Sequence, residues 1–97
     1  MKIIFSSRAN REVRRILEYY TREASAKVAF RFHSDLKAIT DRIKRWPMSF
    51  PLIHTEIRRA ILKKFPFQVV YRIKAENQIR ILAVRHHKQN PNFGLDR

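Results

Sequence analysis

The chain has 97 residues, and we expect residues 1–97 to form a single domain with one modest hydrophobic core. A 44% share of apolar residues, with 11% aromatic, excludes the intrinsically disordered class. The 22 Lys and Arg against 8 Asp and Glu give a net charge of +14, well above the roughly 2 to 8 that solubility requires of a small domain. This excess favours a polyanionic partner (nucleic acid, an anionic membrane surface or an acidic protein) over a merely soluble basic surface.

Targeting and redox signals are absent from the sequence. With no cysteine, disulfides and thiolate chemistry are excluded. The N-terminal apolar run, Ile3 to Phe5, is too short for a signal peptide or a membrane span. We therefore expect a cytoplasmic protein with no membrane association.

The first half of the chain predicts one short strand followed by two helices. Residues 2–5 are β-prone, and Ser7 is expected to cap a helix whose apolar residues recur at helical spacing. Ser25 is expected to cap a second helix, which ends at the Trp46-Pro47 junction because the residue before a proline is pushed out of helical geometry. Only residues 22–25 link the two, which predicts an antiparallel helical hairpin. Core packing explains both apolar stripes.

The second half predicts three strands after a proline-broken connector at residues 47–55. The β-prone runs are residues 57–62, 67–73 and 79–86, and a polar turn at residues 74–78 separates the last two. Such short turns indicate an antiparallel meander with one face covered by the helices. The predicted fold is α+β: an N-terminal strand and a two-helix hairpin packed on a C-terminal antiparallel meander.

No catalytic or nucleotide-binding motif is present. The only glycine is Gly94, so a glycine-rich phosphate loop is excluded, and no carboxylate pair suggests hydrolytic chemistry. His86 and His87 are adjacent at a strand end, where side chains are expected to leave opposite faces and so not to share a metal ion. We expect no metal and no cofactor.

Basic residues gather at the ends of the predicted strands. Antiparallel pairing would bring them together as a cationic patch for a phosphate backbone or an acidic peptide. They fit equally well as solvated charges that discourage edge-to-edge aggregation. The candidate binding residues are Arg58, Arg59, Lys64, Arg85, His86, His87, Lys88 and Phe93.

The amino-acid sequence of the second half of the chain resembles that of a known toxin superfamily. The stretch IRRAILKKFPFQVVYRI followed by IRILAVRHHKQNPNF is similar to the RelE/ParE superfamily of toxins from bacterial type II toxin–antitoxin modules. The resemblance covers nearly the whole chain. It implies two helices on an antiparallel sheet, and a toxin neutralised by an acidic antitoxin that wraps across it, in a complex that can be of higher order.

The superfamily divides by target, and the resemblance carries both alternatives. RelE-like toxins cleave mRNA on the ribosome without a metal, whereas ParE-like toxins inhibit DNA gyrase. Lys64 stands where ribosome-dependent relatives carry a basic residue, His87 where they carry an arginine, and Phe93 where they carry a tyrosine. Phenylalanine has no hydroxyl with which to move a proton or bind phosphate.

The resemblance therefore favours a ParE-like gyrase inhibitor that is not an enzyme. The alternative is a metal-independent mRNA endonuclease, for which the catalytic candidates are Arg58, Lys64 and His87. In that case His87 would replace the arginine as acid or phosphate contact, although a histidine at a strand end is often structural. A non-toxic basic binding module is a third hypothesis.

Overall fold

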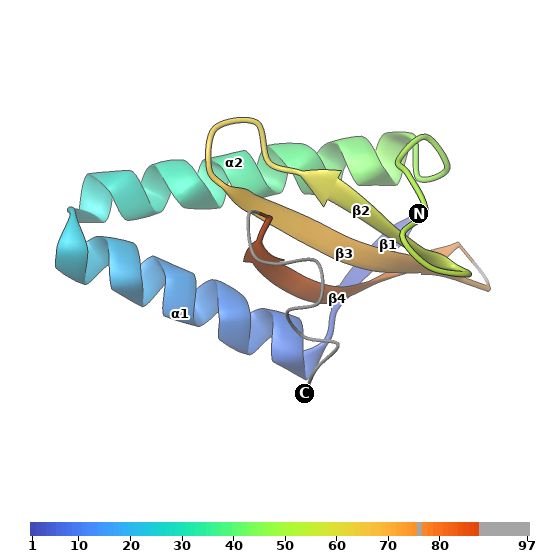
Figure 1. Ribbon diagram of the computed structural model, residues 1–97, viewed down its shortest axis with the longest axis horizontal. Coiled ribbons are helices and arrows are strands. Elements are labelled where there is room, and N and C mark those ends of the chain that lie inside the picture. The colour runs from blue at the N-terminus through green and yellow to red at the C-terminus, as the bar shows by residue number, and fades with distance from the viewer. Residues whose placement is uncertain (76, 88–97) are drawn as a thin grey trace.

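The computed structural model describes residues 1–75 and 77–87, so Lys88 and Phe93 lie outside the described residues. Every predicted helix and strand is present (Figure 1). In chain order the elements are β1 (Lys2–Phe5), α1 (Ser7–Glu23), α2 (Ala26–Arg45), β2 (Ile57–Ile61), β3 (Phe67–Lys74) and β4 (Gln78–His86).

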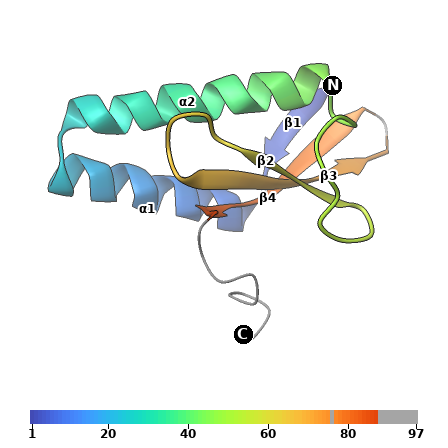
Figure 2. The same cartoon turned by 45° about the horizontal axis from the view of Figure 1, so that its top comes forward.

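Serine side chains start both helices. The Ser6 hydroxyl accepts a hydrogen bond from the Ala9 amide at 3.0 Å, and Ser25 does the same for the Val28 amide at 3.2 Å. The cap of α1 is thus Ser6 rather than the expected Ser7, because Ser6 keeps an extended backbone while Ser7 is already helical. The two helices lie side by side on one side of the sheet, as the hairpin prediction requires (Figure 2).

The sheet has the strand order β1-β4-β3-β2. β3 pairs antiparallel with both β2 and β4, which confirms the meander. β1 pairs parallel with β4, from Lys2 opposite Gln78 to Phe5 opposite Ile81, so the sheet is mixed rather than antiparallel throughout. The parallel pair arises because the helical hairpin carries the chain from β1 at one edge across to β2 at the other.

β4 contains a bulge that the start of α1 holds in place. Val70 pairs with Ala83 but Tyr71 pairs with Ile81, which leaves Leu82 as the extra residue. The Leu82 carbonyl accepts a hydrogen bond from the Ser6 hydroxyl at 3.2 Å, and the Val84 amide donates to Glu12 Oε1 at 2.9 Å. Side chains therefore satisfy two backbone groups at or beside the bulge.

The hydrophobic core lies between the helices and the sheet. Phe32, Tyr71, Ile79 and Ile81 are each fully buried, and each contributes roughly 1.5–3 kcal/mol by leaving water. Aromatic rings from three elements and the β2–β3 loop meet there at centroid distances of 5.3 to 6.3 Å: Tyr20, Phe32, Phe65 and Phe67. No helix in the described part of the chain is long and apolar enough to cross a membrane.

Candidate functional site

The face of the sheet turned away from the helices, here called the open face, carries a group of arginines. Along β3, Val69 and Tyr71 point into the core, so the alternation of the strand places Gln68, Val70 and Arg72 on the open face. By the same alternation Arg59 of β2, and Arg80, Ala83 and Arg85 of β4, lie there too. Arg72 and Arg80 stand directly opposite each other in the strand register.

A cavity of about 630 Å³ opens on this face, and we call it the open-face cavity. Aliphatic side chains from the sheet and the connector supply its apolar surface, and the bulged residue is one of them. Cationic groups come from α1 and from two strands. The lining residues are Arg8, Ile53, His54, Ile57, Arg59, Gln68, Val70, Leu82, Ala83 and Arg85. Its volume is within the range of ligand-binding pockets.

Gln68 is the unusual polar group of this cavity. Its side chain is only 8% exposed, and its carboxamide oxygen has no hydrogen-bond partner among the described residues. A buried acceptor without a donor costs about 1–3 kcal/mol, and such groups are uncommon in native proteins.

Arg58 lies on the other face of β2 from Arg59 and holds the connector. Its guanidinium donates to the carbonyl oxygens of Phe50 at 2.6 Å and Met48 at 3.1 Å. The Tyr71 hydroxyl donates nearby to the Pro47 carbonyl at 2.6 Å. Burial raises the pKa of Tyr71 to about 12, and the positive charge of Arg58 acts in the opposite direction.

Lys64 belongs to the β2–β3 loop, which a buried carboxylate fastens to α2. Asp35 Oδ2 accepts hydrogen bonds from the backbone amides of Lys64 at 2.9 Å and Phe65 at 3.0 Å, and Asp35 is 7% exposed. Lys64 also borders a second, smaller cavity beside α2, together with Phe30 and Arg31. Lys64 is therefore not among the residues that line the open-face cavity.

The side chains of His86 and His87 do not leave opposite faces of the sheet, which corrects the sequence prediction. Their ring centroids are 6.0 Å apart, because His87 follows the last residue of β4 and strand alternation no longer applies. The His86 ring packs edge-on against Phe67 at 5.5 Å, and the His87 amide donates to the Pro66 carbonyl at 3.0 Å. Within residues 1–75 and 77–87, no group of three His, Cys, Asp or Glu is placed to hold a metal ion.

Comparison with known proteins decides the family. The family described as "ParE toxin of type II toxin-antitoxin system, parDE" matches residues 3–91. This chain belongs to the ParE toxin family. The chain is 35% identical to Toxin ParE2 of Mycobacterium tuberculosis (strain H37Rv) over 74 residues, which cover 76% of this chain and 70% of ParE2.

Solved structures agree with the ParE fold. The chain is similar to a chain of the chromosomal ParDE toxin–antitoxin system from P. aeruginosa, with a TM-score of 0.71 and 18% identity over 89% of this chain and 95% of that one. It is also similar to the isolated E. coli RelE toxin, with a TM-score of 0.61 and 15% identity over 98% of this chain and 93% of RelE. The predicted RelE/ParE superfamily and its α+β fold are confirmed.

In this ParE-family chain the structure brings together only part of the predicted residue set. Arg59 and Arg85 share the open-face cavity, while Arg58, Lys64, His86 and His87 do not line it. Sequence reasoning missed the apolar lining of the cavity and three of its polar residues, Arg8, His54 and Gln68. Gln68 had a visible signal, since it is a lone amide inside the apolar run Phe67 to Tyr71.

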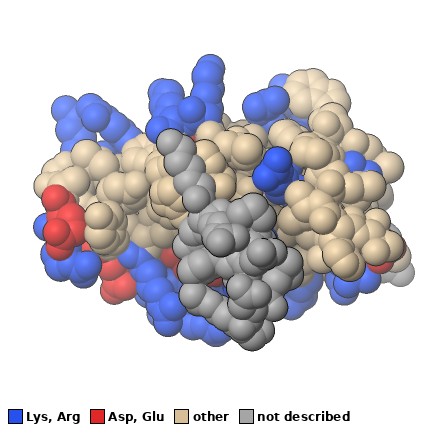
Figure 3. Space-filling view, viewed as in Figure 1, with Lys and Arg blue, Asp and Glu red and all other residues tan. Residues whose placement is uncertain are grey.

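Charge on the surface follows the composition. Figure 3 shows many more blue side chains than red ones on the face turned to the viewer, with blue groups along both the upper and the lower margins. In the described part of the chain, the four ion pairs that form are Arg8–Glu12, Arg22–Glu23, Lys37–Asp41 and Arg72–Glu56. Most cations in residues 1–75 and 77–87 of this toxin therefore have no carboxylate partner within that part of the chain.

Proposed function

We propose that this ParE-family toxin blocks growth by inhibiting DNA gyrase and that an acidic antitoxin neutralises it. The observation that carries the proposal is the match of residues 3–91 to the ParE family, together with 35% identity to a toxin named ParE2. Both gyrase and the antitoxin act in the cytoplasm, which is where we place the protein.

The positions of the catalytic candidates support a non-enzymatic mechanism. Endonuclease chemistry needs its acid, base and phosphate-stabilising groups around one scissile bond. Arg58 is used to hold the connector carbonyls, Lys64 lies in the loop fastened to α2, and His87 follows the end of β4. Arg58 lies near the start of β2, whereas Lys64 and the Pro66 carbonyl that binds the His87 amide both lie in the loop after β2, which supports a separation of Arg58 from the other two candidates.

The net charge of +14 supports an acidic antitoxin. A partner that covers this surface must supply carboxylates, since few of the described cations have one within the chain. Complementary charge also speeds the association of two proteins, which suits an antitoxin that must bind the toxin before the toxin reaches its target.

Expression from a tightly controlled promoter tests this function. Nascent protein synthesis, plasmid supercoiling and DNA-damage induction are followed together in the same cells. We expect loss of supercoiling and DNA damage while messages stay intact. Early translational arrest with mRNA cut inside codons would instead support the RelE-like endonuclease, and absence of any growth effect would leave a non-toxic binding module.

A further inference from the structure

Three features of the open face bear on what could bind there. The first is the unpartnered carboxamide oxygen of Gln68, which is buried at the wall of the open-face cavity. Because its last side-chain torsion is soft, the amide can turn to meet a donor that enters the cavity. A ligand with a hydrogen-bond donor would satisfy this oxygen.

The second feature is a repeated positive charge. Arg59, Arg85 and Arg8 come from β2, β4 and α1 and border the cavity, and Arg72 and Arg80 continue the same face. Like charges directly opposite on neighbouring strands destabilise a sheet, and Arg72 and Arg80 are such a pair. Arg72 binds the carboxylate of the exposed Glu56, whereas Arg80 has no carboxylate partner among the residues that the structure describes. A ligand with several anions in a row would relieve this repulsion.

The third feature is the apolar surface that lies beside the arginines. Val70, Leu82 and Ala83 line the cavity between the arginines. A flat nucleobase can lie on such a surface, with its amino or imino group near Gln68, while the phosphates of its strand meet the guanidinium groups. In a duplex each base face is covered by its stacked neighbours and cannot lie on an apolar wall, so the fit is to a single strand.

We infer that the open face binds a single strand of DNA, with phosphates at Arg59 and Arg85 and an unpaired base against Gln68. The inference rests on the proposed function for the choice of DNA over RNA, since a gyrase inhibitor meets its target on DNA. An acidic peptide could also meet the arginines, but five of them on or beside one face suit the regular charge of a nucleic acid strand better.

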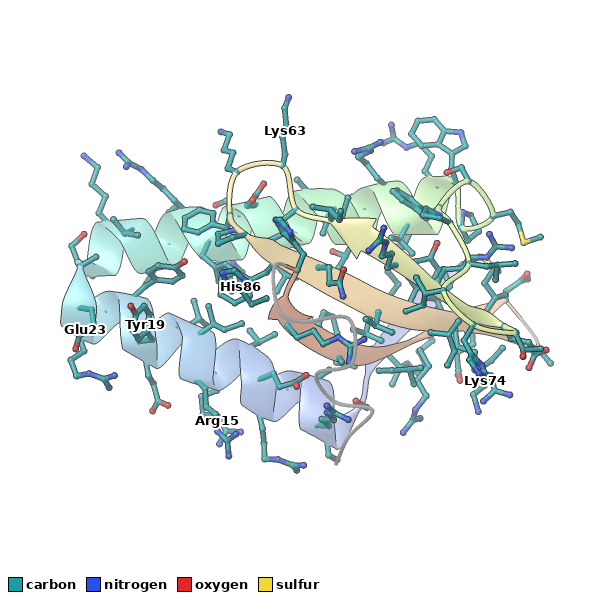
Figure 4. The ribbon with its side chains drawn as sticks, viewed as in Figure 1. Arg15, Tyr19, Glu23, Lys63, Lys74 and His86 are labelled. Atoms are coloured by element: carbon teal, nitrogen blue, oxygen red, sulfur yellow. The ribbon has the colours of Figure 1, made fainter. Side chains whose placement is uncertain are left out.

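Fluorescence anisotropy with a labelled twelve-residue oligothymidine measures the binding directly. We expect Arg59→Ala and Arg85→Ala each to weaken binding about tenfold, and the double variant to lower the slope of log affinity against log salt by about 1.4, because each phosphate contact on a single strand contributes about 0.7. Arg15→Ala removes the same charge from a side chain that points away from the sheet on α1, and its effect should be under twofold (Figure 4).

Gln68→Leu separates recognition from charge. It keeps the volume and the net charge, so the salt slope should stay unchanged while affinity for the strand falls about fivefold, in the range of one lost hydrogen bond. Circular dichroism of each variant confirms that the fold persists. Arg59→Lys retains the charge and should restore the salt slope but not the full affinity, since an ammonium lacks the bidentate fork.

Competing probes decide between ligands. A twelve-residue oligouridine that binds more tightly than the DNA would overturn the assignment to DNA, and a polyglutamate peptide that displaces the strand at equal concentration would overturn the assignment to nucleic acid. Equal loss of binding in Arg15→Ala and Arg59→Ala would show nonspecific attraction only and overturn the site. Strand binding without gyrase inhibition would overturn the proposed function but support the binding site. Gyrase inhibition without strand binding would support the proposed function but overturn the binding site.

Discussion

The carboxylate of Asp35 offers a sharp test of how the β2–β3 loop is held. Asp35 lies on α2, is 7% exposed, and accepts two backbone hydrogen bonds, from Lys64 at 2.9 Å and from Phe65 at 3.0 Å. The Phe65 ring belongs to the aromatic cluster of the core, so the two amides also position a core residue. Asp35→Ala removes both acceptor contacts at once.

The expected loss follows from the geometry. A hydrogen bond to a charged group contributes about 1.5–3 kcal/mol to stability. Asp35→Ala leaves two amides without their acceptor, and the better helix propensity of alanine recovers a few tenths of a kcal/mol, so the free energy of unfolding should fall by about 3–4 kcal/mol. In a domain of this size 1 kcal/mol shifts Tm by about 4–8 °C, so the melting temperature should fall by about 12–32 °C. Asp35→Asn keeps one acceptor without its charge and should lose about half as much.

Thermal and urea unfolding measure these differences, with Asp41→Ala as the control. Asp41 sits on the same helix but is exposed and forms only a surface pair with Lys37 at 3.4 Å, so its loss should stay within about 0.5 kcal/mol. If Asp35→Ala costs no more than Asp41→Ala, the carboxylate does not fasten the loop and the reasoning is refuted.

Three further substitutions test other parts of the structure. Tyr71→Phe removes a phenol, and burial raises the pKa of that phenol to about 12. The unfolded chain releases the proton from about pH 10 while the folded chain retains it, so between pH 10 and 12 the stability of the wild type should fall by about 2 kcal/mol more than that of the variant. Urea midpoints that change in parallel for the two proteins would contradict this. Gln68→Leu should raise stability by about 1 kcal/mol in thermal unfolding, and a lower Tm would mean that the amide is satisfied in solution. Glu12→Ala should cost about 2 kcal/mol and speed hydrogen exchange at the Val84 amide, whereas Glu12→Gln should keep most of the protection; unchanged exchange in both would exclude Glu12 as the support of the bulge.

The order of elements was predictable because each has a local cause in the sequence. Proline at position 47 ends α2, and Ser25 starts it, so both ends of that helix follow from single residues. The meander followed from short turns and alternation in residues 67–73. The position of β1 did not, because a four-residue strand carries no signal for the strand with which it pairs.

The candidate site was less predictable, for physical reasons visible in three residues. Arg58 and Arg59 are neighbours in sequence, yet the strand places them on opposite faces, and the structural role of Arg58 appears only in its bonds to the Phe50 and Met48 carbonyls. Arg8 reaches the cavity because the first turn of α1 packs on the β4 bulge, and the bulge at Leu82 has no sequence marker. The candidates Lys88 and Phe93 lie outside the described residues and stay predictions.

The central claim is that this ParE-family toxin acts on DNA gyrase rather than on messages at the ribosome. The most direct measurement adds the purified toxin to purified gyrase and relaxed plasmid, and in parallel to a cell-free translation reaction with a labelled message. We predict that supercoiling stops at toxin concentrations that leave the message whole and translation running. A cut message and arrested translation with normal supercoiling would contradict the account.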